Sequence, residues 1–355
     1  MKGIILHGGH GTRLRPLTHT GPKQLLPIAN KPMSEYCIES IKEAGIKDIA
    51  IIIGGLGSKK VREYYGTGEK FGLSFTYIEQ DYPKGIAHAI QLCKKFVKNE
   101  KFLVFLGDNI IQKSIHEYAL KFEKSNFDAT VLLCKVDNPS RFGIASVKDG
   151  KIIKIIEKPK NPSSDLAVTG IYFLTSKIFE IIDNLKPSWR NELEITDALD
   201  ILLEKNHNLS YEIITDYWKD TGTPEDIIHA NGQLIEKMDP LFFGVKEDNV
   251  KINGTVIVGK NSLIKSDVII NGPAIIGENC LINSGITIGP NVSIGKNSNI
   301  SKCSLMNSII MENCKIDLDV NIRNSIVSNN SEIISDNKSN NESVFLLGEG
   351  TKIFL

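Results

Sequence analysis

The sequence predicts a two-domain α/β protein, in which an open sheet covered by helices over residues 1–240 is followed by a parallel β-helix over residues 251–355. Up to about residue 240, short apolar runs of strand length alternate with segments of helical periodicity, as expected for helices packed on a sheet. Beyond Asp239-Pro240, aliphatic residues recur every six positions, the period of coils stacked in a β-helix. The length of 355 residues also suits two domains better than one.

The first domain begins with the apolar run Ile4–Leu6, a buried strand that leads directly into a glycine-containing loop. After it, strands and helices alternate in a Rossmann-like order, and Asp149-Gly150 marks a two-residue hairpin turn. Thr223 and Pro224 match the N-cap and first position of a helix that continues to about residue 238. The remaining expected helices cover residues 34–44, 59–65, 86–96 and 193–204, and the remaining expected strands cover residues 49–53, 75–79, 102–106 and 129–136.

The second domain is predicted from a six-residue repeat, in which each aliphatic side chain stacks on its equivalent in the next coil. The Asn- and Ser-rich stretch over residues 329–342 is expected to be a loop, and residues 351–355 a terminal strand. The repeating residues are Ile252, Val258, Ile264, Ile270, Ile276, Ile282, Ile288, Ile294, Ile300 and Met306, and after a slip Ile310, Ile316 and Ile322.

Composition argues against several classes of protein. Lys and Arg number 42 and Asp and Glu number 42, so no overall field favours nucleic acid or an anionic membrane. No run approaches the roughly 18 apolar residues that a membrane span requires, and the chain starts in a strand rather than a signal sequence. The six cysteines contain no Cys-x-x-Cys pair, which is typical of reduced thiols. We therefore expect a cytoplasmic protein that binds neither nucleic acid nor membrane.

The loop after the first strand is a candidate phosphate site. Gly8, Gly9 and Gly11 allow successive backbone N–H groups to point into one concavity, and Arg13 and Lys23 add positive charge around it. The pattern is neither a Walker loop nor Gly-x-Gly-x-x-Gly, so it indicates a different kind of nucleotide site.

The stretch from residue 8 to residue 33 closely resembles the signature of sugar-1-phosphate nucleotidyltransferases, and in particular of the long-form glucose-1-phosphate thymidylyltransferases with a C-terminal left-handed β-helix. It reads Gly-Gly-x-Gly-Thr-Arg-Leu-x-Pro-Leu-Thr and then Pro-Lys-Gln-Leu-Leu-Pro-Ile-x-x-Lys-Pro-Met. The resemblance implies that a phosphate oxygen of glucose 1-phosphate attacks the α-phosphorus of dTTP and releases pyrophosphate. Because the nucleophile is already an anion, the protein must supply positioning and charge neutralisation rather than a general base.

The resemblance also implies roles for the residues around the nucleotide. Arg13 would bind the departing pyrophosphate, Lys23 the α-phosphate and Lys158 the sugar phosphate. An amide such as that of Gln80 both donates to and accepts from a pyrimidine edge, and a glycine such as Gly85 lets the base approach the backbone. The full set of expected nucleotide-binding residues is Leu6, Gly8, Gly9, Gly11, Thr12, Gln24, Gln80 and Gly85.

Two acids are expected to hold Mg²⁺. Asp108 ends a buried strand at the edge of the sheet where ligands collect. Asp220 lies in Trp-Lys-Asp-Thr-Gly-Thr, which is similar to the family's Trp-x-Asp-Thr-Gly-Thr motif. For the sugar, the resemblance implies Gly143, Glu157, Val168 and Thr196.

Several alternatives remain open from the sequence. Pro-Lys-Gln-Leu at residues 22–25 is the thymidylyl-like form, yet a UTP-using enzyme stays possible. A non-catalytic subunit is less expected, because Arg13, Lys23, Asp108, Lys158 and Asp220 are all present. A third alternative is a bifunctional enzyme with an acyltransferase β-helix. All seven histidines precede the β-helix, however, so we expect that domain to be structural and to hold a homo-oligomer together, as a trimer or a multiple of it.

Two of those histidines, His7 and His10, stand where small residues are more usual in this family. Together with His19 they do not indicate a transition-metal site, because they lie in one loop without an acid or cysteine partner. We interpret both as loop residues.

Overall fold

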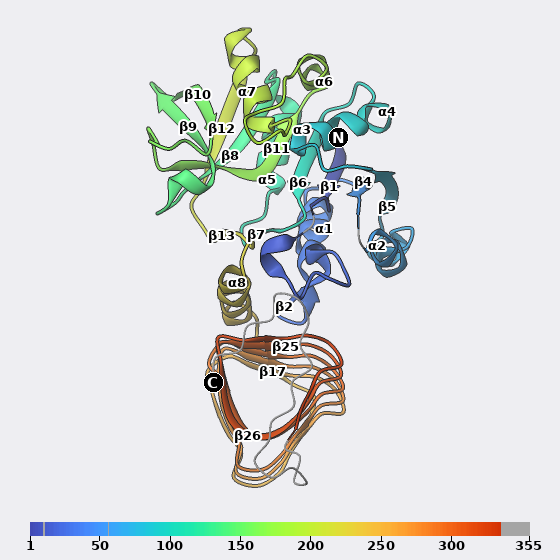
Figure 1. Cartoon of the computed structure of the whole chain (residues 1–355), viewed down its shortest axis with the longest axis vertical. Coiled ribbons are helices and arrows are strands. Elements are labelled where there is room, and N and C mark those ends of the chain that lie inside the picture. The colour runs from blue at the N-terminus through green and yellow to red at the C-terminus, as the bar shows by residue number, and fades with distance from the viewer. Residues whose placement is uncertain (10, 56, 335–355) are drawn as a thin grey trace. The chain divides into compact units, whose positions relative to one another are not determined.

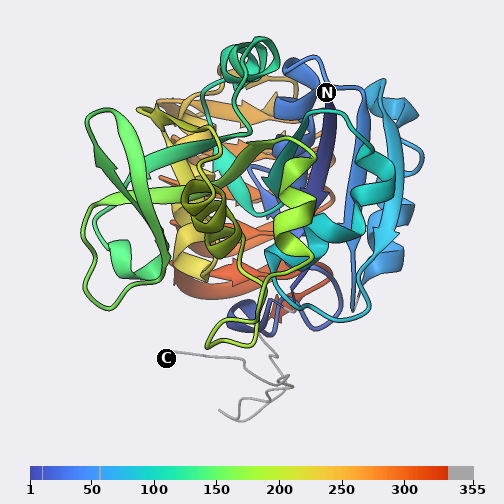
Figure 2. The same ribbon diagram turned by 90° about the horizontal axis from the view of Figure 1, so that it is seen from above.

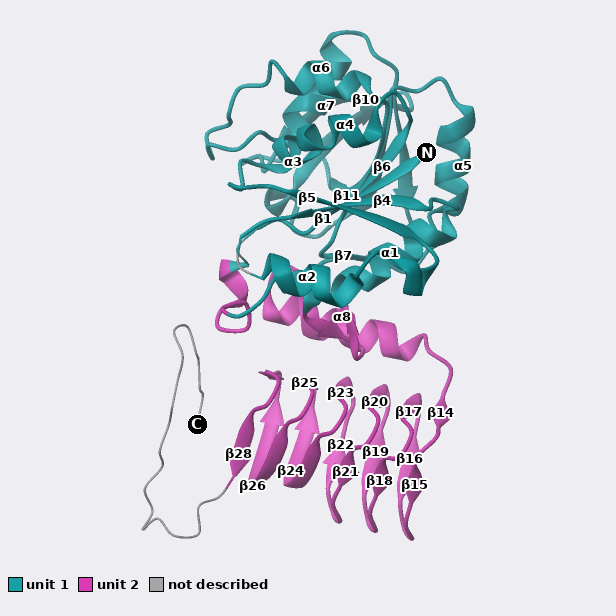
Figure 3. Cartoon of the chain, turned by 90° about the vertical axis from the view of Figure 1, so that its right-hand side faces the viewer, with its two compact units in different colours: residues 1–11, 20–25, 33–220 teal, residues 12–19, 26–32, 221–355 magenta. Residues whose placement is uncertain are grey.

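The computed structural model describes residues 1–9, 11–55 and 57–334. The chain folds into two compact units (Figure 3). The first comprises Met1–Gly11, Thr20–Leu25 and Met33–Asp220, and the second comprises Thr12–His19, Leu26–Pro32 and the chain from Thr221. The expected domain boundary near residue 240 therefore differs from this division, in which residues 221–240 and two short N-terminal segments belong with the β-helix. None of the described helices is both long and apolar enough to cross a membrane.

An open sheet forms the centre of the first unit (Figures 1 and 2), in the order β10-β9-β11-β6-β1-β4-β5. The central strand β1 pairs in parallel with β4 and β6, so the carboxyl ends of all three strands meet at one edge. Beyond them β11 runs antiparallel to β6 and also pairs with β8, which pairs with β12. The strands are β1 Lys2–Leu6, β4 Asp48–Ile53, β5 Ser74–Glu79, β6 Phe102–Leu106, β8 Ala129–Lys135, β9 Gly143–Lys148, β10 Lys151–Glu157, β11 Leu166–Leu174 and β12 Leu209–Ile214.

Helices cover both faces of this sheet, as the alternating pattern predicts. Ile4 and Leu6 belong to one apolar core and Ile5 to the other, because successive side chains of a strand point to opposite faces. The helix expected over residues 86–96 is in fact two, because the backbone tightens at Cys93, whose N–H bonds the oxygen of Ile90 at 2.9 Å. The helices are α1 Met33–Glu43, α2 Ser58–Tyr65, α3 Ile86–Leu92, α4 Lys94–Val97, α5 His116–Lys124, α6 Lys177–Ile182 and α7 Ile195–Glu204, with 3₁₀ turns η2 Lys23–Leu25, η3 Glu69–Phe71 and η4 Pro139–Arg141.

Parallel coils form most of the second unit, and Figure 1 shows them nearly end-on as a triangle. Ile264 pairs with Ile282 and Ile282 with Ile300, so one coil spans three hexapeptides and the aliphatic side chains stack in the centre. The coil strands are β14 Leu241–Phe242, β15 Val245–Lys246, β16 Lys251–Asn253, β17 Val256–Val258, β18 Leu263–Ile264, β19 Ile269–Asn271, β20 Ala274–Ile276, β21 Leu281–Ile282, β22 Thr287–Ile288, β23 Val292–Ile294, β24 Asn299–Met306, β25 Ser308–Ile310, β26 Lys315–Arg323, β27 Ile326–Val327 and β28 Glu332–Ile334.

Two details of the predicted repeat are wrong. Leu305, not Met306, faces the core and pairs with Ile288, because the register of β24 shifts between Ser301 and Cys303. The stretch expected to be a loop from residue 329 contains β28, because Ile333 pairs with Ile316 and packs on the apolar core of the coils. The terminal strand expected over residues 351–355 lies outside the described residues.

The second unit also contains the hairpin of β2 (Pro27–Ile28) and β3 (Lys31–Pro32), the turn η1 (Thr12–Leu14) and helix α8 (Pro224–Glu236). The predicted cap of α8 is present, since the hydroxyl of Thr223 accepts from the N–H of Asp226 at 3.3 Å.

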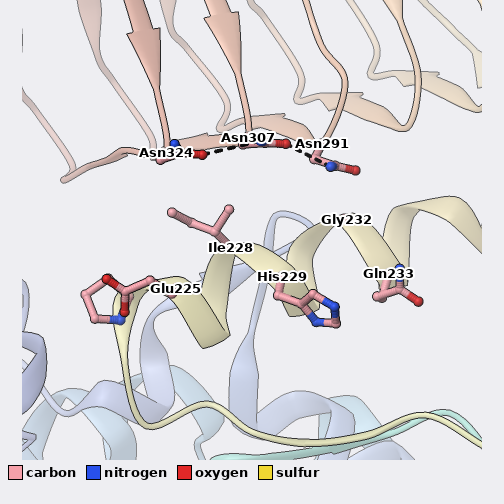
Figure 4. Close-up of a pocket in the computed structure, with 9 residues that line it drawn as sticks. Glu225, Ile228, His229, Gly232, Gln233, Asn291, Asn307 and Asn324 are labelled. Carbon is pink, nitrogen blue, oxygen red and sulfur yellow. Dashed lines mark hydrogen bonds between the residues drawn. The ribbon is translucent and has the colours of Figure 1, made fainter.

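A cavity of about 320 Å³ lies between α8 and a ladder of asparagines on the coils (Figure 4). Asn291 donates to Asn307 at 2.8 Å and Asn307 to Asn324 at 3.3 Å, while Ile228 of α8 points toward this ladder. The lining side chains, all within the described part of the chain, include none of the predicted catalytic, nucleotide, sugar or metal residues.

Candidate active site

Lys23 and Asp108 meet at the carboxyl end of β1 and β6. The ammonium of Lys23 forms an ion pair with the carboxylate of Asp108, and both side chains are largely buried. Burial alone would raise the pKa of Asp108, but the charge and hydrogen bond of Lys23 lower it below its usual value. Asp108 is therefore a carboxylate rather than a carboxylic acid at neutral pH.

Asp220 reaches the same place from the far end of the first unit. Strand β13 (Trp218–Asp220) pairs antiparallel with β7 (Asn109–Ile111), and the register sets Asp220 opposite Asn109. The side chain of Asn109 fixes this pair, because its oxygen accepts from the indole N–H of Trp218 at 2.8 Å. The structure thus pairs Asp220 with the residue that follows Asp108 in the sequence.

These acids suit Mg²⁺ by the chemistry of their donors. Carboxylate oxygens are hard ligands, and Mg²⁺ is commonly held by one or two of them together with substrate phosphates. Among the described residues, no group of three or more His, Cys, Asp and Glu side chains lies close enough to hold a metal ion alone. A metal at this site would consequently depend on oxygens supplied by the substrates.

The glycine loop is flanked by two buried amides. Gln24 is 1% exposed and donates to the oxygen of Gly8 at 3.3 Å. The side-chain oxygen of Gln80 lies 3.1 Å from where a Cβ would stand on Gly8, so a side chain at this position would crowd that oxygen. Leu6 ends β1 directly before this loop, and Gly9 and Gly11 follow with φ of 103° and 57°. Gln24 and Gln80 therefore lie at the glycine loop that follows Leu6.

Gly85 lies at the start of α3, against the backbone of Leu193. A Cβ on Gly85 would stand 2.5 Å from the oxygen of Leu193, and its φ of 103° also favours glycine. The N–H of Leu193 donates to the backbone oxygen of Lys84 at 2.7 Å, and the N–H of Ala87 donates to the backbone oxygen of Leu193 at 3.0 Å. These bonds connect the segment expected to contact the base with the loop that precedes α7.

Glu157 is the centre of the predicted sugar site. The hydroxyl of Thr196 donates to its Oε2 at 3.0 Å, and a Cβ on Gly143 would stand 3.1 Å from the same oxygen. The ammonium of Lys158 lies 3.5 Å from Oε1 of Glu157. Val168 is buried in β11, next to Ala167, which pairs with Ile144 of β9. The structure thus brings three of the four predicted sugar residues, with Lys158, into direct proximity.

Tyr172 of β11 is influenced by one acid of the predicted metal site, Asp108, and by one acid of the predicted sugar site, Glu157. Burial, and after it the charges of Glu157 and Asp108, raise the pKa of the Tyr172 phenol. Both carboxylates therefore lie within electrostatic reach of one side chain.

Thr12 and Arg13 belong to the second unit. Both guanidinium nitrogens of Arg13 lie 3.1 Å from where a Cβ would stand on Gly222, two residues after Asp220 in the sequence. The roles expected for Thr12 and Arg13 stay predictions.

Sequence reasoning missed Arg190. Its guanidinium lies 3.3 Å from Glu157, 3.2 Å from Glu194 and 3.0 Å from Glu192. Burial, followed by the charge of Glu157, raises the pKa of Glu194, so Arg190 balances a group of acids that would otherwise repel one another. A basic residue directly before the acidic stretch over residues 192–197 was the available signal.

His7 is buried, and His10 lies outside the described residues. Among the described residues neither ring nitrogen of His7 has a hydrogen-bond partner. Burial lowers the pKa of His7 to about 3, and the nearby charge of Asp108 opposes this only in part. His7 is therefore neutral at physiological pH.

Comparison with known proteins places the chain among enzymes with this kind of site. The family model described as nucleotidyl transferase matches residues 2–237. The chain belongs to the nucleotidyl transferase family. The model described as the GMPPB C-terminal domain matches residues 270–353 of this nucleotidyl transferase.

Individual relatives agree with that family. The chain is 43% identical over 263 residues to the low-salt glycan biosynthesis nucleotidyltransferase Agl11 of Haloferax volcanii, covering 74% of each protein. It is 40% identical over 271 residues to a glucose-1-phosphate thymidylyltransferase of Streptomyces antibioticus, covering 76% of each. A crystal structure from Bacillus anthracis, assigned as a glucose-1-phosphate thymidylyltransferase and solved with sucrose, is 44% identical with a TM-score of 0.64 and covers 68% of this chain and 98% of its own. These relatives support a sugar-1-phosphate nucleotidyltransferase.

Proposed function

We propose that the protein is a glucose-1-phosphate thymidylyltransferase, which forms dTDP-glucose and pyrophosphate from dTTP and glucose 1-phosphate. The observation that carries this proposal is the pairing of two clusters in one unit. Lys23, Asp108 and Asp220 form one cluster, suited to phosphates, and Glu157 with Thr196 forms the other, suited to sugar hydroxyls. The name of the Streptomyces antibioticus relative supports the choice of reaction.

The residues of the chain act by position and charge. Asp108 holds the ammonium of Lys23 at the end of β1, so a positive charge already stands where the α-phosphate would bind. Glu157 accepts from sugar hydroxyls, and Thr196 keeps its carboxylate oriented by donating to Oε2. Lys158 neutralises the sugar phosphate, and Arg13 the departing pyrophosphate. No residue needs to remove a proton, because the attacking phosphate oxygen is already ionised.

Asp108 and Asp220 would hold Mg²⁺. When bound, this ion supplies charge neutralisation to the triphosphate and orients the α-phosphate for in-line attack. The two acids would therefore act by presenting oxygen ligands to the ion.

Preference for dTTP over UTP depends on small chemical differences between the two nucleotides. The two nucleotides differ by a thymine methyl and a 2′-hydroxyl, and a single methyl in an apolar pocket gives about 1–3 kcal/mol of discrimination. The segment Pro22-Lys23-Gln24-Leu25 supports dTTP, and UTP is the alternative substrate.

The proposal is tested by pyrophosphate release from a panel of nucleoside triphosphates and sugar 1-phosphates. The highest kcat/KM is expected with dTTP and glucose 1-phosphate, with activity lost in EDTA and restored by Mg²⁺. A clear preference for UTP or GTP would overturn the nucleotide assignment, and full turnover without any divalent metal would overturn the metal site.

The β-helix is proposed to be structural, with exposed coil faces that associate into a homo-oligomer, as a trimer or a multiple of it. A full-length chain that sediments as a monomer would contradict this.

The six cysteines form no disulfide, which supports a cytoplasmic location.

A further inference from the structure

Gln80 is buried at the end of β5, and its backbone position is fixed by a hydrogen bond to β4. The orientation of its side-chain amide is then the feature that can vary. Gln80 follows β5, its N–H bonds the oxygen of Ile53 at 2.8 Å, and its side chain is 5% exposed. A Cβ on Gly54 would stand 2.5 Å from the oxygen of Gln80, so the neighbouring loop lies directly against this backbone. The side chain must therefore find its hydrogen-bond partners within a narrow space.

Two neighbours define which way the amide faces. Its nitrogen lies 2.9 Å from Nδ1 of His88 in α3, and its oxygen is turned toward Gly8 of the nucleotide loop. An amide nitrogen only donates and an amide oxygen only accepts, whereas a neutral imidazole has one donor and one acceptor nitrogen. Nδ1 of a neutral His88 therefore accepts from Gln80 and leaves the oxygen of Gln80 facing the loop.

The surroundings of His88 keep it neutral. Burial lowers its pKa, and so does Lys84 on the preceding loop. The acids on nearby helices have other partners: Asp183 after α6 pairs with Lys94 of α4, and Glu194 at the start of α7 pairs with Arg190. No described acid therefore offsets the effect of Lys84 on the His88 ring.

We propose that His88 makes the site reject cytosine, by orienting the amide of Gln80. This inference rests on the proposed use of a thymidine or uridine triphosphate. Thymine and uracil present a donor at N3, which the fixed oxygen of Gln80 accepts. Cytosine presents an acceptor at N3, which would meet that oxygen without a proton between them. His88 is thus a positioning residue, and its neutral Nδ1 excludes CTP.

Substitution of His88 separates this role from general packing. In His88→Asn, Oδ1 is bonded to Cγ as Nδ1 is in histidine, so the acceptor is retained. In His88→Leu a methyl group replaces it, and the amide of Gln80 is free to turn its nitrogen toward the base. Dissociation constants for dTTP, UTP and CTP should be measured by calorimetry on the full-length chain with Mg²⁺.

We expect the ratio of CTP to dTTP dissociation constants to fall about tenfold in His88→Leu, as expected for one hydrogen bond, and to stay near wild type in His88→Asn. The ratio of UTP to dTTP should not change, because both bases present the same N3–H. Should His88→Leu fail to fold, His88→Ala removes the ring without adding a new group. An unchanged CTP ratio in a folded Leu or Ala variant overturns the proposal.

A double substitution tests whether His88 acts through Gln80. In a Gln80→Leu background, His88→Leu should have no further effect on the CTP ratio, and a further effect would contradict action through the amide. These binding measurements do not depend on which sugar is used. If the chain binds dTTP but does not turn over glucose 1-phosphate, the proposed function fails while the role of His88 is still decided.

Discussion

Asp220 lies opposite Asn109, the residue that follows Asp108, in the antiparallel pair of β13 and β7. A strand of three residues thereby joins the end of the first unit to the edge of its central sheet. The side-chain oxygen of Asn109 accepts two hydrogen bonds here, from the indole N–H of Trp218 at 2.8 Å and from the N–H of Gly170 at 3.3 Å. The position of Asp220 next to the Asp108-Asn109 segment is therefore set by backbone pairing.

Replacing either acid should abolish most activity without unfolding the protein. We expect Asp108→Asn and Asp220→Asn each to lower kcat at least about 100-fold, because a ligand of the expected Mg²⁺ is lost. Asp149→Asn is the matched control, since Asp149 is exposed in the β9–β10 hairpin and its φ of 50° suits asparagine. Near wild-type kcat in either active-site variant would show that the two-carboxylate site is wrong.

The hydroxyl of Thr196 should matter for the sugar rather than the nucleotide. Thr196→Val keeps the shape but removes the bond to Glu157, and we expect KM for glucose 1-phosphate to rise about tenfold with little change in KM for dTTP. Thr196→Ser retains the hydroxyl and should be close to wild type. Equal changes in both KM values would argue that Thr196 supports the fold rather than Glu157.

Arg190 should set the pH range over which the sugar binds. In Arg190→Gln the acids Glu157 and Glu194 lose their shared positive partner, and the pKa of Glu194, which burial and the charge of Glu157 already raise, should rise further. The acid limb of the kcat/KM profile for glucose 1-phosphate should then move to higher pH. Arg62→Gln, which removes an exposed partner of Glu79, is the control and should leave the profile in place. An unshifted acid limb in Arg190→Gln would contradict this role.

His7 should make the folded protein sensitive to acid. Its pKa of about 3 in the folded state lies below the ordinary value of 6.5, so between these values the unfolded chain binds a proton that the folded chain does not. Stability is therefore lost as pH falls through this window, by about 2 kcal/mol between pH 7 and pH 5. Urea unfolding in EDTA should show this loss reduced in His7→Ala relative to wild type. If the two proteins lose stability in parallel, His7 is not held neutral.

The β-helix should lack acyltransferase activity. Burial raises the pKa of Cys303 to about 11, and burial also raises the pKa of Cys280 and Cys314. None of these thiols is suited to act as a base near neutral pH. The full-length protein should therefore release no free coenzyme A from acetyl-CoA and glucosamine 1-phosphate. Measurable release would show that the coils carry a second active site.

Local signals made much of the fold predictable. Ile4–Leu6 followed by glycines indicated a strand and a ligand loop, and Thr223-Pro224 indicated the start of α8, because each depends on neighbouring residues alone. The break at Leu305 was not predictable, because a β-bulge near Ser301 shifts the register without interrupting the aliphatic pattern.

The site was predictable where a residue lies in a recognisable motif. Asp108 and Asp220 fall in short sequence motifs, and the fold pairs Asp220 with Asn109, the residue that follows Asp108. Arg190 and His88 were missed because the role of each depends on a partner that is not its neighbour in the sequence. Arg190 pairs with Glu157, and His88 contacts Gln80. Spacing along the chain does not reveal such pairs.

The most direct test of the account is ³¹P NMR of the purified full-length chain with dTTP, glucose 1-phosphate and Mg²⁺. We predict that the resonances of both substrates decline together while those of a nucleoside diphosphate sugar and of pyrophosphate appear in equal amounts. Release of inorganic phosphate from dTTP, with the glucose 1-phosphate resonance unchanged, would contradict nucleotidyl transfer at this site.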